Sequence, residues 1–134
     1  MRILVADDSS EILGFFSRFL SKGHDLTLVE DGNKAIEKAG AEDFDIIFLD
    51  YYMPGLTGVD TCKVIKQLKP GSKVIIMSGS FPNEREFRNN MGEESNNLVD
   101  GFLYKPFFLD DLRKCLKNVG EGKNAIPLFA AKGL

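Results

Sequence analysis

Short apolar runs alternate with segments of helical periodicity along most of this sequence. Five of the runs have the length and composition of β-strands; they are 2–8, 25–31, 44–50, 73–79 and 101–105. The clearest helical segments place apolar residues three or four positions apart; they are 9–23, 33–40, 58–69 and 110–119. Strands that are apolar on both faces are typical of a parallel sheet covered by helices on each side. The alternation therefore predicts an α/β fold, a doubly wound five-stranded parallel sheet in a three-layer sandwich.

One segment fits this pattern poorly. Residues 83–98 should supply the remaining helix, but they contain few apolar residues, four asparagines beyond Asn83, and Gly92 near the middle. Asparagine and glycine are weak helix formers and are common in loops. We therefore expect a short or broken helix, with a mobile loop at 92–97.

The end of the chain differs in composition from the rest. Residues 120–134 begin like a linker, with Gly-Glu-Gly, and then contain Ile126, Leu128 and Phe129. We expect one domain at 1–119 and a C-terminal tail or linker at 120–134. Two interpretations of this tail stay open: a frayed terminus, and a docking segment or the start of a further domain.

Length, charge and cysteine content exclude several classes of protein. The chain has 134 residues and a net charge of -3, with acids and bases mixed along it, so no basic block predicts direct nucleic-acid binding. Its apolar runs are far shorter than the roughly 20 residues of a membrane span, and we expect no signal peptide, because Met1-Arg2 leads directly into an apolar strand without a cleavage site. We interpret Cys62 and Cys115 as reduced thiols and expect a cytoplasmic protein. His24 is the only histidine, which argues against a histidine-ligated zinc site or a Ser-His-Asp triad.

Charged and polar residues follow four of the expected strands, at the point where each strand ends. They are Asp7 and Asp8 after the first strand, Asp50 after the third, Ser78 after the fourth, and Lys105 with Pro106 after the fifth. The carboxyl ends of parallel strands meet at one edge of a sheet, where ligands bind in folds of this kind. We therefore expect these side chains to share one crevice, although they span most of the sequence.

The chemistry of this group points to a metal ion and a phosphoryl group. Three carboxylates within a few ångströms repel one another by on the order of a kcal/mol or more per pair, unless a cation lies among them. Oxygen ligands with room for water favour Mg²⁺. The ion, the Lys105 ammonium and the Ser78 hydroxyl would then surround a phosphoryl group, with Asp50 as the nucleophile that forms an acyl phosphate.

The same residues resemble those of the response-regulator receiver domain, the phosphoacceptor module of two-component signalling. The resemblance covers residues 2–119 and is carried by Asp7-Asp8, by Asp50 followed by Met53-Pro54-Gly55 and Gly58, by Ser78 after Val-Ile-Ile-Met, and by Lys105-Pro106-Phe107. It implies the flavodoxin-like sheet of chemotaxis regulators, with strand order 2-1-3-4-5. It also implies a signalling phosphoacceptor that assists its own Mg²⁺-dependent chemistry, and not an enzyme in the usual sense.

The resemblance assigns the metal and phosphoryl ligands residue by residue. Asp50 would accept a phosphoryl group from the histidine of a kinase or a phosphotransfer protein. Mg²⁺ would be held by Asp8, Asp50 and the backbone carbonyl of Tyr52, with Asp7 acting through water. Lys105 would contact the phosphoryl group, and its peptide bond to the following proline would be cis.

The resemblance also implies a switch. Ser78 would move to hydrogen-bond the phosphoryl oxygen, and Phe102, at the switch aromatic position, would change rotamer. Phosphorylation would then reshape the face built from the helix of 83–98, the strand of 101–105 and the helix of 110–119. A downstream partner or output domain would recognise that face, and a homodimer is a further possible partner.

The chain departs from the family pattern at several places. Tyr52 and Ser80 flank the path of attacking water, so the Tyr52 ring is predicted to slow loss of the phosphoryl group. Phe108 replaces a polar capping residue, so the last helix would depend on Asp110 and Asp111. At the first helix, Asp8 with Glu11 three residues later has the spacing of a capping pair.

Three other functions are compatible with an α/β fold of this kind. A phosphatase of the haloacid dehalogenase type would carry an acid where this chain has Tyr52. A flavodoxin-like cofactor binder would need a phosphate-cradling loop after the first strand, where 6–10 carries two acids. A phosphorylation-independent interaction module of receiver fold is the alternative, although it leaves Asp8, Asp50 and Lys105 without a role.

Overall fold

The computed structural model describes residues 1–120 as five strands and six helices in alternation. The strands are β1 (Arg2–Ala6), β2 (Asp25–Val29), β3 (Ile46–Asp50), β4 (Lys73–Ser78) and β5 (Gly101–Tyr104). The helices are α1 (Ser10–Leu20), α2 (Gly32–Ala41), α3 (Gly58–Leu68), α4 (Glu84–Asn90), α5 (Glu93–Leu98) and α6 (Leu109–Gly120). The segment 121–134, where a tail or linker was predicted, lies outside the described residues.

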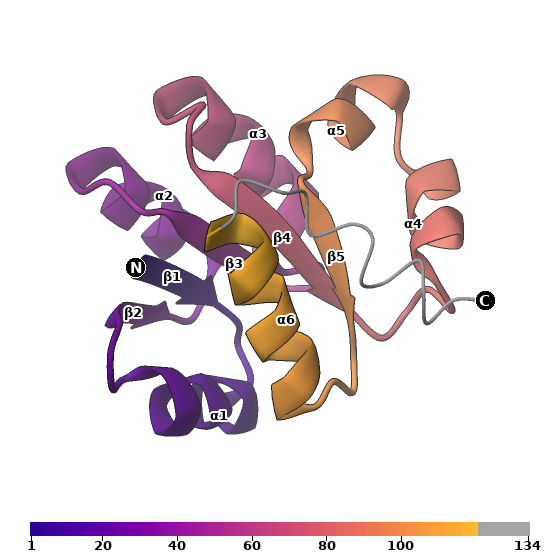
Figure 1. Cartoon of the computed structure of the whole chain (residues 1–134). Coiled ribbons are helices and arrows are strands. Elements are labelled where there is room, and N and C mark those ends of the chain that lie inside the picture. Colours follow the sequence, from indigo (N-terminus) through magenta and orange to yellow (C-terminus); the bar gives the residue numbers. More distant parts are fainter. Residues whose placement is uncertain (121–134) are drawn as a thin grey trace.

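The strands form one parallel sheet in the order β2-β1-β3-β4-β5 (Figure 1). This confirms the predicted flavodoxin-like topology. β1 and β3 lie side by side, with Ala6 opposite Leu49. The strand order changes direction between them, because β2 is added on the outer side of β1, whereas β4 and β5 are added beyond β3. In sheets of this type the ligand crevice lies at the carboxyl ends of the strands near that reversal.

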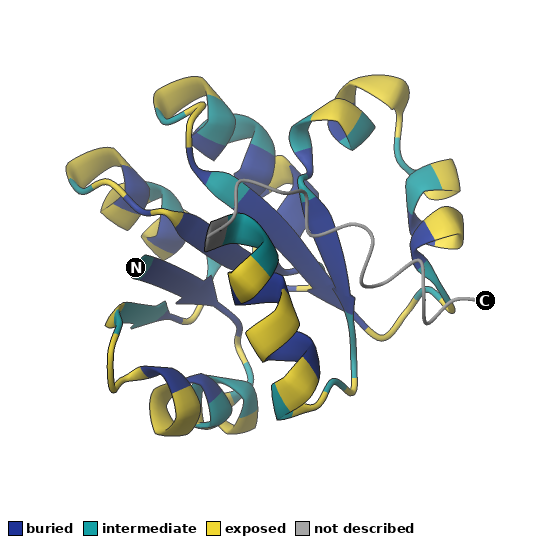
Figure 2. Ribbon diagram, in the orientation of Figure 1, coloured by how far each residue is buried: buried dark blue, intermediate teal, exposed yellow. Residues whose placement is uncertain are grey.

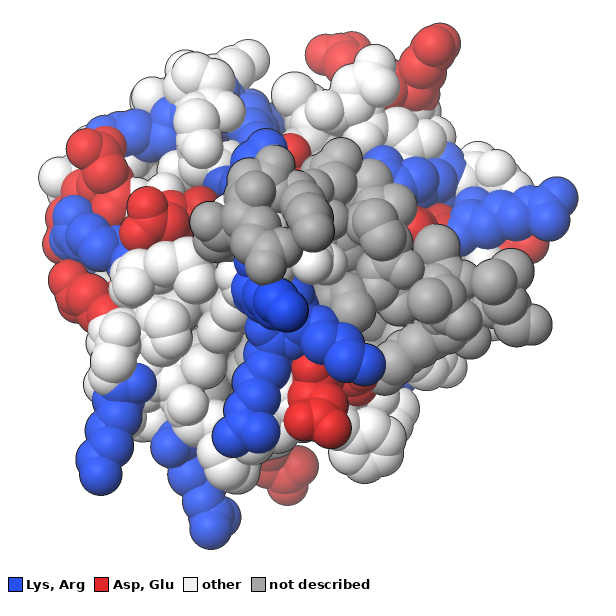
Figure 3. All heavy atoms as spheres, viewed as in Figure 1, with Lys and Arg blue, Asp and Glu red and all other residues white. Residues whose placement is uncertain are grey.

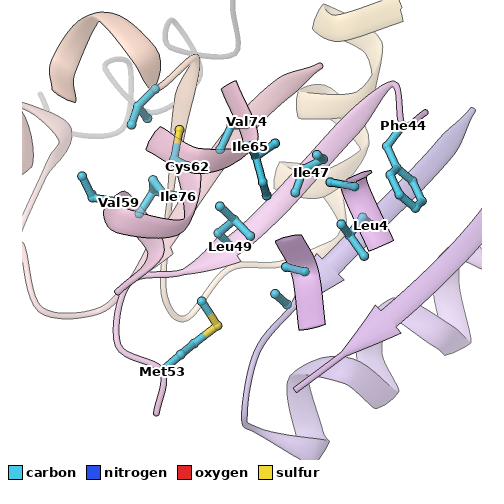
Figure 4. Close-up of a cluster of buried hydrophobic side chains, with 14 of the residues drawn as sticks. Leu4, Phe44, Ile47, Leu49, Met53, Val59, Cys62, Ile65, Val74 and Ile76 are labelled. Atoms are coloured by element: carbon cyan, nitrogen blue, oxygen red, sulfur yellow. The ribbon is translucent and has the colours of Figure 1, made fainter. Parts of the chain in front are cut away.

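Helices cover both faces of the sheet because its strands are apolar on both faces. On one face, alternate strand residues pack under α2, α3, α4 and α5, in the cluster that Figure 4 shows in part; Leu4, Ile47, Leu49, Val74 and Ile76 belong to it. On the other face, the residues between them pack under α1 and α6; Ile3, Val5, Ile46, Phe48, Ile75 and Met77 belong to that cluster. The central strands are accordingly buried along their length (Figure 2). Such burial stabilises the fold by about 1.5–3 kcal/mol for each large apolar side chain.

The expected helix of 83–98 is broken, as predicted, but the predicted loop at 92–97 is wrong. Residues 93–98 form the helix α5, which begins after Gly92. The guanidinium of Arg88 in α4 supports α5 by donating hydrogen bonds to the backbone oxygens of Asn96 (2.9 Å) and Val99 (3.3 Å). The Asn96 amide donates back to the Arg88 carbonyl at 2.8 Å. These bonds supply the anchoring that the asparagine-rich sequence did not predict.

The mixed surface charge and the two unpaired cysteines are as the composition predicts. On the face seen in Figure 3, acidic and basic side chains both occur, and basic ones gather over α6, where Arg113, Lys114 and Lys117 are exposed. Cys62 and Cys115 are free and buried, and burial raises the pKa of each thiol to about 12. Among residues 1–120, no helix has the length and apolar character needed to cross a membrane.

Candidate functional site

The carboxyl edge of the sheet brings the three predicted aspartates together. Asp7 and Asp8 directly follow β1, and Asp50 is the last residue of β3. Each offers one carboxylate oxygen, and these atoms all lie within 4.8 Å of one another. Asp7 is fully buried and Asp50 is 8% exposed, whereas Asp8 is open to solvent. The group is thus a pocket with two buried acids at its base and one acid at its mouth.

Lys105, directly after β5, reaches into the same pocket. Its Nζ lies 2.7 Å from Asp7 Oδ2 and 3.1 Å from Asp50 Oδ1, so one ammonium bridges two carboxylates. The first of these bonds joins residues 98 positions apart in the sequence. Three ionised carboxylates and one ammonium leave two negative charges, which is the charge that a divalent cation would neutralise.

Burial and charge together set the acidity of this group. Burial raises the pKa of Asp50 to about 6, and the negative charge of Asp7 adds to this effect, while Lys105 opposes it. Burial alone would lower the pKa of Lys105, but its hydrogen bond to Asp7 and the charges of Asp50 and Asp7 outweigh burial and raise it. Lys105 therefore stays protonated, and Asp50 ionises only near neutral pH.

The end of β4 packs tightly against Lys105. Ser78 Oγ accepts a hydrogen bond from the Ser80 N–H at 3.0 Å, and the Ser78 carbonyl accepts one from the Lys105 N–H at 3.0 Å. A side chain at Gly79 would come within 3.2 Å of the Lys105 carbonyl oxygen, so only glycine fits there without displacement. Ser78 is buried, and because Oγ serves as an acceptor in the turn, its hydroxyl hydrogen is not used in that bond.

A tight turn holds the end of β3 in place. The Gly58 N–H donates to the Tyr51 carbonyl at 2.9 Å, and the Tyr51 N–H donates to the Met77 carbonyl at 2.8 Å. A Cβ on Gly58 would clash with the backbone carbonyl oxygen of Asp50. The Pro-Gly sequence makes this return possible, since Gly55 adopts φ +82°. Tyr52 lies in the turn and is 61% exposed.

Capping of α1 differs from the prediction. The cap is Ser9, whose Oγ accepts a hydrogen bond from the Ile12 N–H at 3.4 Å, and the predicted Asp8–Glu11 cap is wrong. The Ser9 N–H in turn donates to Asp7 Oδ1 at 2.9 Å. One carboxylate oxygen of Asp8 lies instead within 4.8 Å of an oxygen from each of the other two acids.

The loop after β5 has the two features expected of it. The Lys105–Pro106 peptide bond is cis. The Phe108 N–H at the start of α6 donates to Asp111 Oδ2 at 2.8 Å, so an acid of the first helical turn replaces a polar cap. Phe108 itself is exposed.

Phe102 is buried in the core, and three further aromatic residues lie between it and the pocket. Phe102 packs on Phe87 of α4, with ring centroids 4.7 Å apart. Phe87 in turn packs on Phe81, and Phe81 on Tyr51, the neighbour of Asp50. The sequence pattern does not predict a role for Tyr51, Phe81 or Phe87. Phe81 and Phe87 lie within an otherwise polar stretch of the sequence, and this contrast is the feature that could have indicated a buried position for them.

Comparison with known proteins agrees with this geometry. Residues 3–117 match the response regulator receiver domain family. The chain is 32% identical, over 107 residues, to the alkaline phosphatase synthesis transcriptional regulatory protein PhoP of Bacillus subtilis, covering 79% of this chain and 42% of PhoP. The chain thus spans less than half the length of that relative.

Solved structures of receiver proteins share the fold. The response regulator TrrA of Thermotoga maritima, solved in complex with Mg(2+)-BeF, has a TM-score of 0.75 and 27% identity, with 88% of this chain and 97% of that chain covered. The complex of the histidine kinase ThkA with TrrA matches with a TM-score of 0.73, 27% identity and the same coverage. The chemotaxis protein CheY4 of Vibrio cholerae gives 0.71 at 25% identity, with 88% and 97% covered. Together with the acidic pocket, these matches show that the chain belongs to the response regulator receiver domain family of two-component signalling.

Proposed function

We propose that this chain is a phosphoacceptor, in which Asp50 takes a phosphoryl group from the phosphohistidine of a kinase or a phosphotransfer protein. The observation that carries the proposal is the position of Asp50, between two other carboxylates within 4.8 Å and a lysine at 3.1 Å. We assign the receiver domain to residues 1–119 and a tail or linker to 120–134. We also propose a cytoplasmic location, supported by the two free cysteines.

The pocket suits Mg²⁺ as a cofactor. Its donors are oxygens, its net charge is opposite to that of the ion, and the exposed Asp8 leaves room for water. Both oxygens of Asp7 already accept hydrogen bonds, from Ser9 and Lys105, which supports a role for Asp7 through water. Asp8, Asp50 and the Tyr52 carbonyl would then be the direct ligands. When bound, Mg²⁺ would neutralise charge on the phosphoryl oxygens, and the related protein TrrA was solved with Mg(2+)-BeF.

The chain's own residues carry the transfer. A carboxylate oxygen of Asp50 attacks phosphorus, the P–N bond breaks, and the imidazole nitrogen leaves with the electron pair, which yields an acyl phosphate on Asp50. Lys105, which donates to the Asp50 carboxylate before transfer, then donates a hydrogen bond to a phosphoryl oxygen. The Ser78 hydroxyl donates to a second oxygen. Because the pKa of Asp50 is about 6, its nucleophilic carboxylate form predominates at neutral pH.

We propose that the change reaches the surface formed by α4, β5 and α6. Movement of Ser78 would alter the turn that precedes α4, and Phe102 lies in β5 at the family's switch position. A downstream partner or an output domain would recognise this surface, and self-association is a further possibility. The ThkA–TrrA complex supports a histidine kinase as the upstream partner.

A small phosphodonor tests the proposal without knowledge of the kinase. With acetyl phosphate and Mg²⁺, intact mass should rise by one phosphoryl group in the wild type and not in Asp50→Asn. Asp110→Asn is the matched control, because Asp110 is an exposed acid outside the pocket, and it should label like the wild type. No adduct with any donor would support the alternative, an interaction module of receiver fold that works without phosphorylation.

A further inference from the structure

The two faces of the sheet differ in how many helices cover them. Helices α2 to α5 pack on one face, whereas among residues 1–120 only α1 and α6 pack on the other. Several apolar side chains on the α1–α6 side are only half-buried against its core; they are Met1, Ile12, Leu13, Phe15, Leu26, Leu28, Phe107 and Val119. This side of the fold therefore has apolar surface that a further segment could cover.

Three phenylalanines join α1 to the loop that precedes α6. We call Phe107, Phe15 and Phe19 the aromatic strip. Phe107 meets Phe15 edge to face, with ring centroids 5.5 Å apart, and Phe15 packs on Phe19 at 4.9 Å. Phe19, in the last turn of α1, is 40% exposed. The strip therefore runs along α1 and ends in an open aromatic ring.

The sequence after α6 contains an uncharged apolar run. Residues 120–124 read Gly-Glu-Gly-Lys-Asn, and residues 125–131 read Ala-Ile-Pro-Leu-Phe-Ala-Ala. Pro127 disfavours a continuous helix, and seven extended residues span about 23 Å. The 12 residues of α6, at about 1.5 Å each, measure about 18 Å. The run is therefore long enough to return along the whole of α6.

Helix α6 ends on the side of the molecule that carries the strip. Val119, in its last turn, packs against the same core as Phe15 and Phe107. Helices α1 and α6 each follow a strand of the parallel sheet, so both begin at its carboxyl edge and run back toward the opposite edge (Figure 1). The end of α6 and the Phe19 end of the strip thus lie toward the same edge of the sheet. One reversal of direction in 120–124 would bring the apolar run onto the strip.

We propose that residues 125–131 dock on the aromatic strip of the same chain, with Ile126 and Leu128 against Phe15 and Phe19. In an extended segment, residues two positions apart point to the same side, so these two aliphatic side chains can enter the strip together. Because the run is joined to α6 by a short linker, its effective concentration at the strip is on the order of millimolar. A separate partner protein would have to displace it.

Surface charge favours this occupant over a second copy of the chain. The exposed charges of α1 and α6 are mostly basic: Glu11 and Asp110 are acidic, whereas the basic ones are Arg18, Lys22, Arg113, Lys114 and Lys117. Two copies that met through this face would bring like charges together, which is unfavourable. The run 125–131 carries no charge and avoids this repulsion.

Nuclear Overhauser effects in the whole chain test the docking directly. With labelled methyl groups, Ile126 and Leu128 should show cross-peaks to the ring protons of Phe15 or Phe19. In a mixture of labelled and unlabelled chains, isotope filtering should show that these cross-peaks arise within one chain. Cross-peaks between chains would overturn the inference in favour of a second copy. Cross-peaks only to another face, such as that of Leu68 in α3, which is 49% exposed, or no cross-peaks at all, would also overturn it.

Hydrogen exchange of α1 gives a second readout. The double variant Ile126→Ser, Leu128→Ser should speed exchange of α1 peptides by roughly three- to tenfold, the gain from two partly buried aliphatic side chains less the entropy of ordering the segment. Lys132→Ser, in the same segment but outside the run, is the matched control and should exchange like the wild type. Unchanged α1 exchange in the double variant would overturn the inference.

Coupling between the two surfaces completes the test. In a Phe19→Ser background the Ile126→Ser, Leu128→Ser pair should have little further effect, whereas in Phe19→Leu, which keeps an apolar strip, it should have its full effect. Effects that simply add in the Phe19→Ser background would show that the run and the strip do not touch. Acetyl phosphate labelling should be the same in all of these variants, because docking does not involve the pocket. Failure of the docking and failure of the proposed function are therefore observed separately.

Discussion

Replacing Asp50 by asparagine should stabilise the metal-free protein at neutral pH, because the native carboxylate is ionised there at a cost. The pKa of Asp50 rises from an ordinary value of 3.8 to about 6, chiefly through burial and then through the charge of Asp7. At about 1.4 kcal/mol for each pKa unit, ionisation of Asp50 lowers the free energy of unfolding by roughly 3 kcal/mol. Asparagine has nearly the same shape and no charge, so we expect a net gain of about 1–3 kcal/mol.

The sign of this effect gives it a distinctive pH dependence. Below pH 3.8 the carboxyl group is protonated in both the folded and the unfolded chain, so Asp50 costs nothing. Between pH 3.8 and about 6 the unfolded chain ionises first, and the stability of the wild type falls relative to that of the variant. Above about pH 6 the difference is complete and constant. Titrating groups remote from Asp50 are common to both proteins and cancel in the comparison.

Urea denaturation in EDTA between pH 4 and 8 measures this difference. The chain has no tryptophan, so far-UV circular dichroism is the suitable signal. At roughly 3–5 °C per kcal/mol for a domain of this size, thermal unfolding should show the gain as a clear rise in Tm. Asp110→Asn should show no such pH-dependent gain. An Asp50→Asn protein that is no more stable than the wild type at pH 7.5, or equally favoured at pH 4 and pH 7.5, would refute the reasoning.

Three further predictions follow from the same geometry. Mg²⁺ should raise the Tm of the wild type, with about 1.4 kcal/mol of stabilisation at ten times its Kd, and should raise the Tm of Asp50→Asn much less. A wild type whose Tm does not change in millimolar Mg²⁺ would contradict the proposed metal site. Tyr52→Ala should speed loss of the phosphoryl group, measured as decay of the phosphorylated mass. Phe19→Ala, which removes another exposed ring, should not change the decay. Equal decay in the wild type and both variants would mean that Tyr52 does not shield the phosphoryl group from water. Gly58→Ala should lower the free energy of unfolding by roughly 1–3 kcal/mol in urea denaturation, because its Cβ meets the Asp50 carbonyl. As a control, Gly14→Ala, in an open position of α1, should raise that free energy by about 0.5–1 kcal/mol. A Gly58→Ala protein as stable as the wild type would show that the turn is looser than described.

The order of apolar runs and the residues at their ends were sufficient to predict the sheet and the pocket. Strands apolar on both faces require helices on both sides, and parallel strands end at one edge, so Asp7, Asp50 and Lys105 had to meet if the fold was right. The distances within the pocket could not be predicted. The bridging position of Lys105 depends on where β5 ends, which the core packing sets.

The errors came from contacts between elements. The helix α5 forms because Arg88, eight residues before Asn96, bonds to its carbonyl, and no local propensity reports such a bond. The packing of Tyr51, Phe81, Phe87 and Phe102 likewise joins residues of two loops, one helix and one strand that no periodic pattern relates. Ser9 caps α1, and Asp8 lies beside the other two acids, an arrangement that a capping motif alone does not reveal.

The central claim is that Asp50 is the acceptor and that the acids around it act through a metal. The most direct measurement treats the chain with acetyl phosphate across a Mg²⁺ titration and locates the phosphoryl group by peptide mapping. The account predicts label on the peptide that contains Asp50, dependent on Mg²⁺ and greatly reduced in Asp8→Asn. Label on another residue, or label on Asp50 that neither Mg²⁺ nor Asp8 affects, would contradict it.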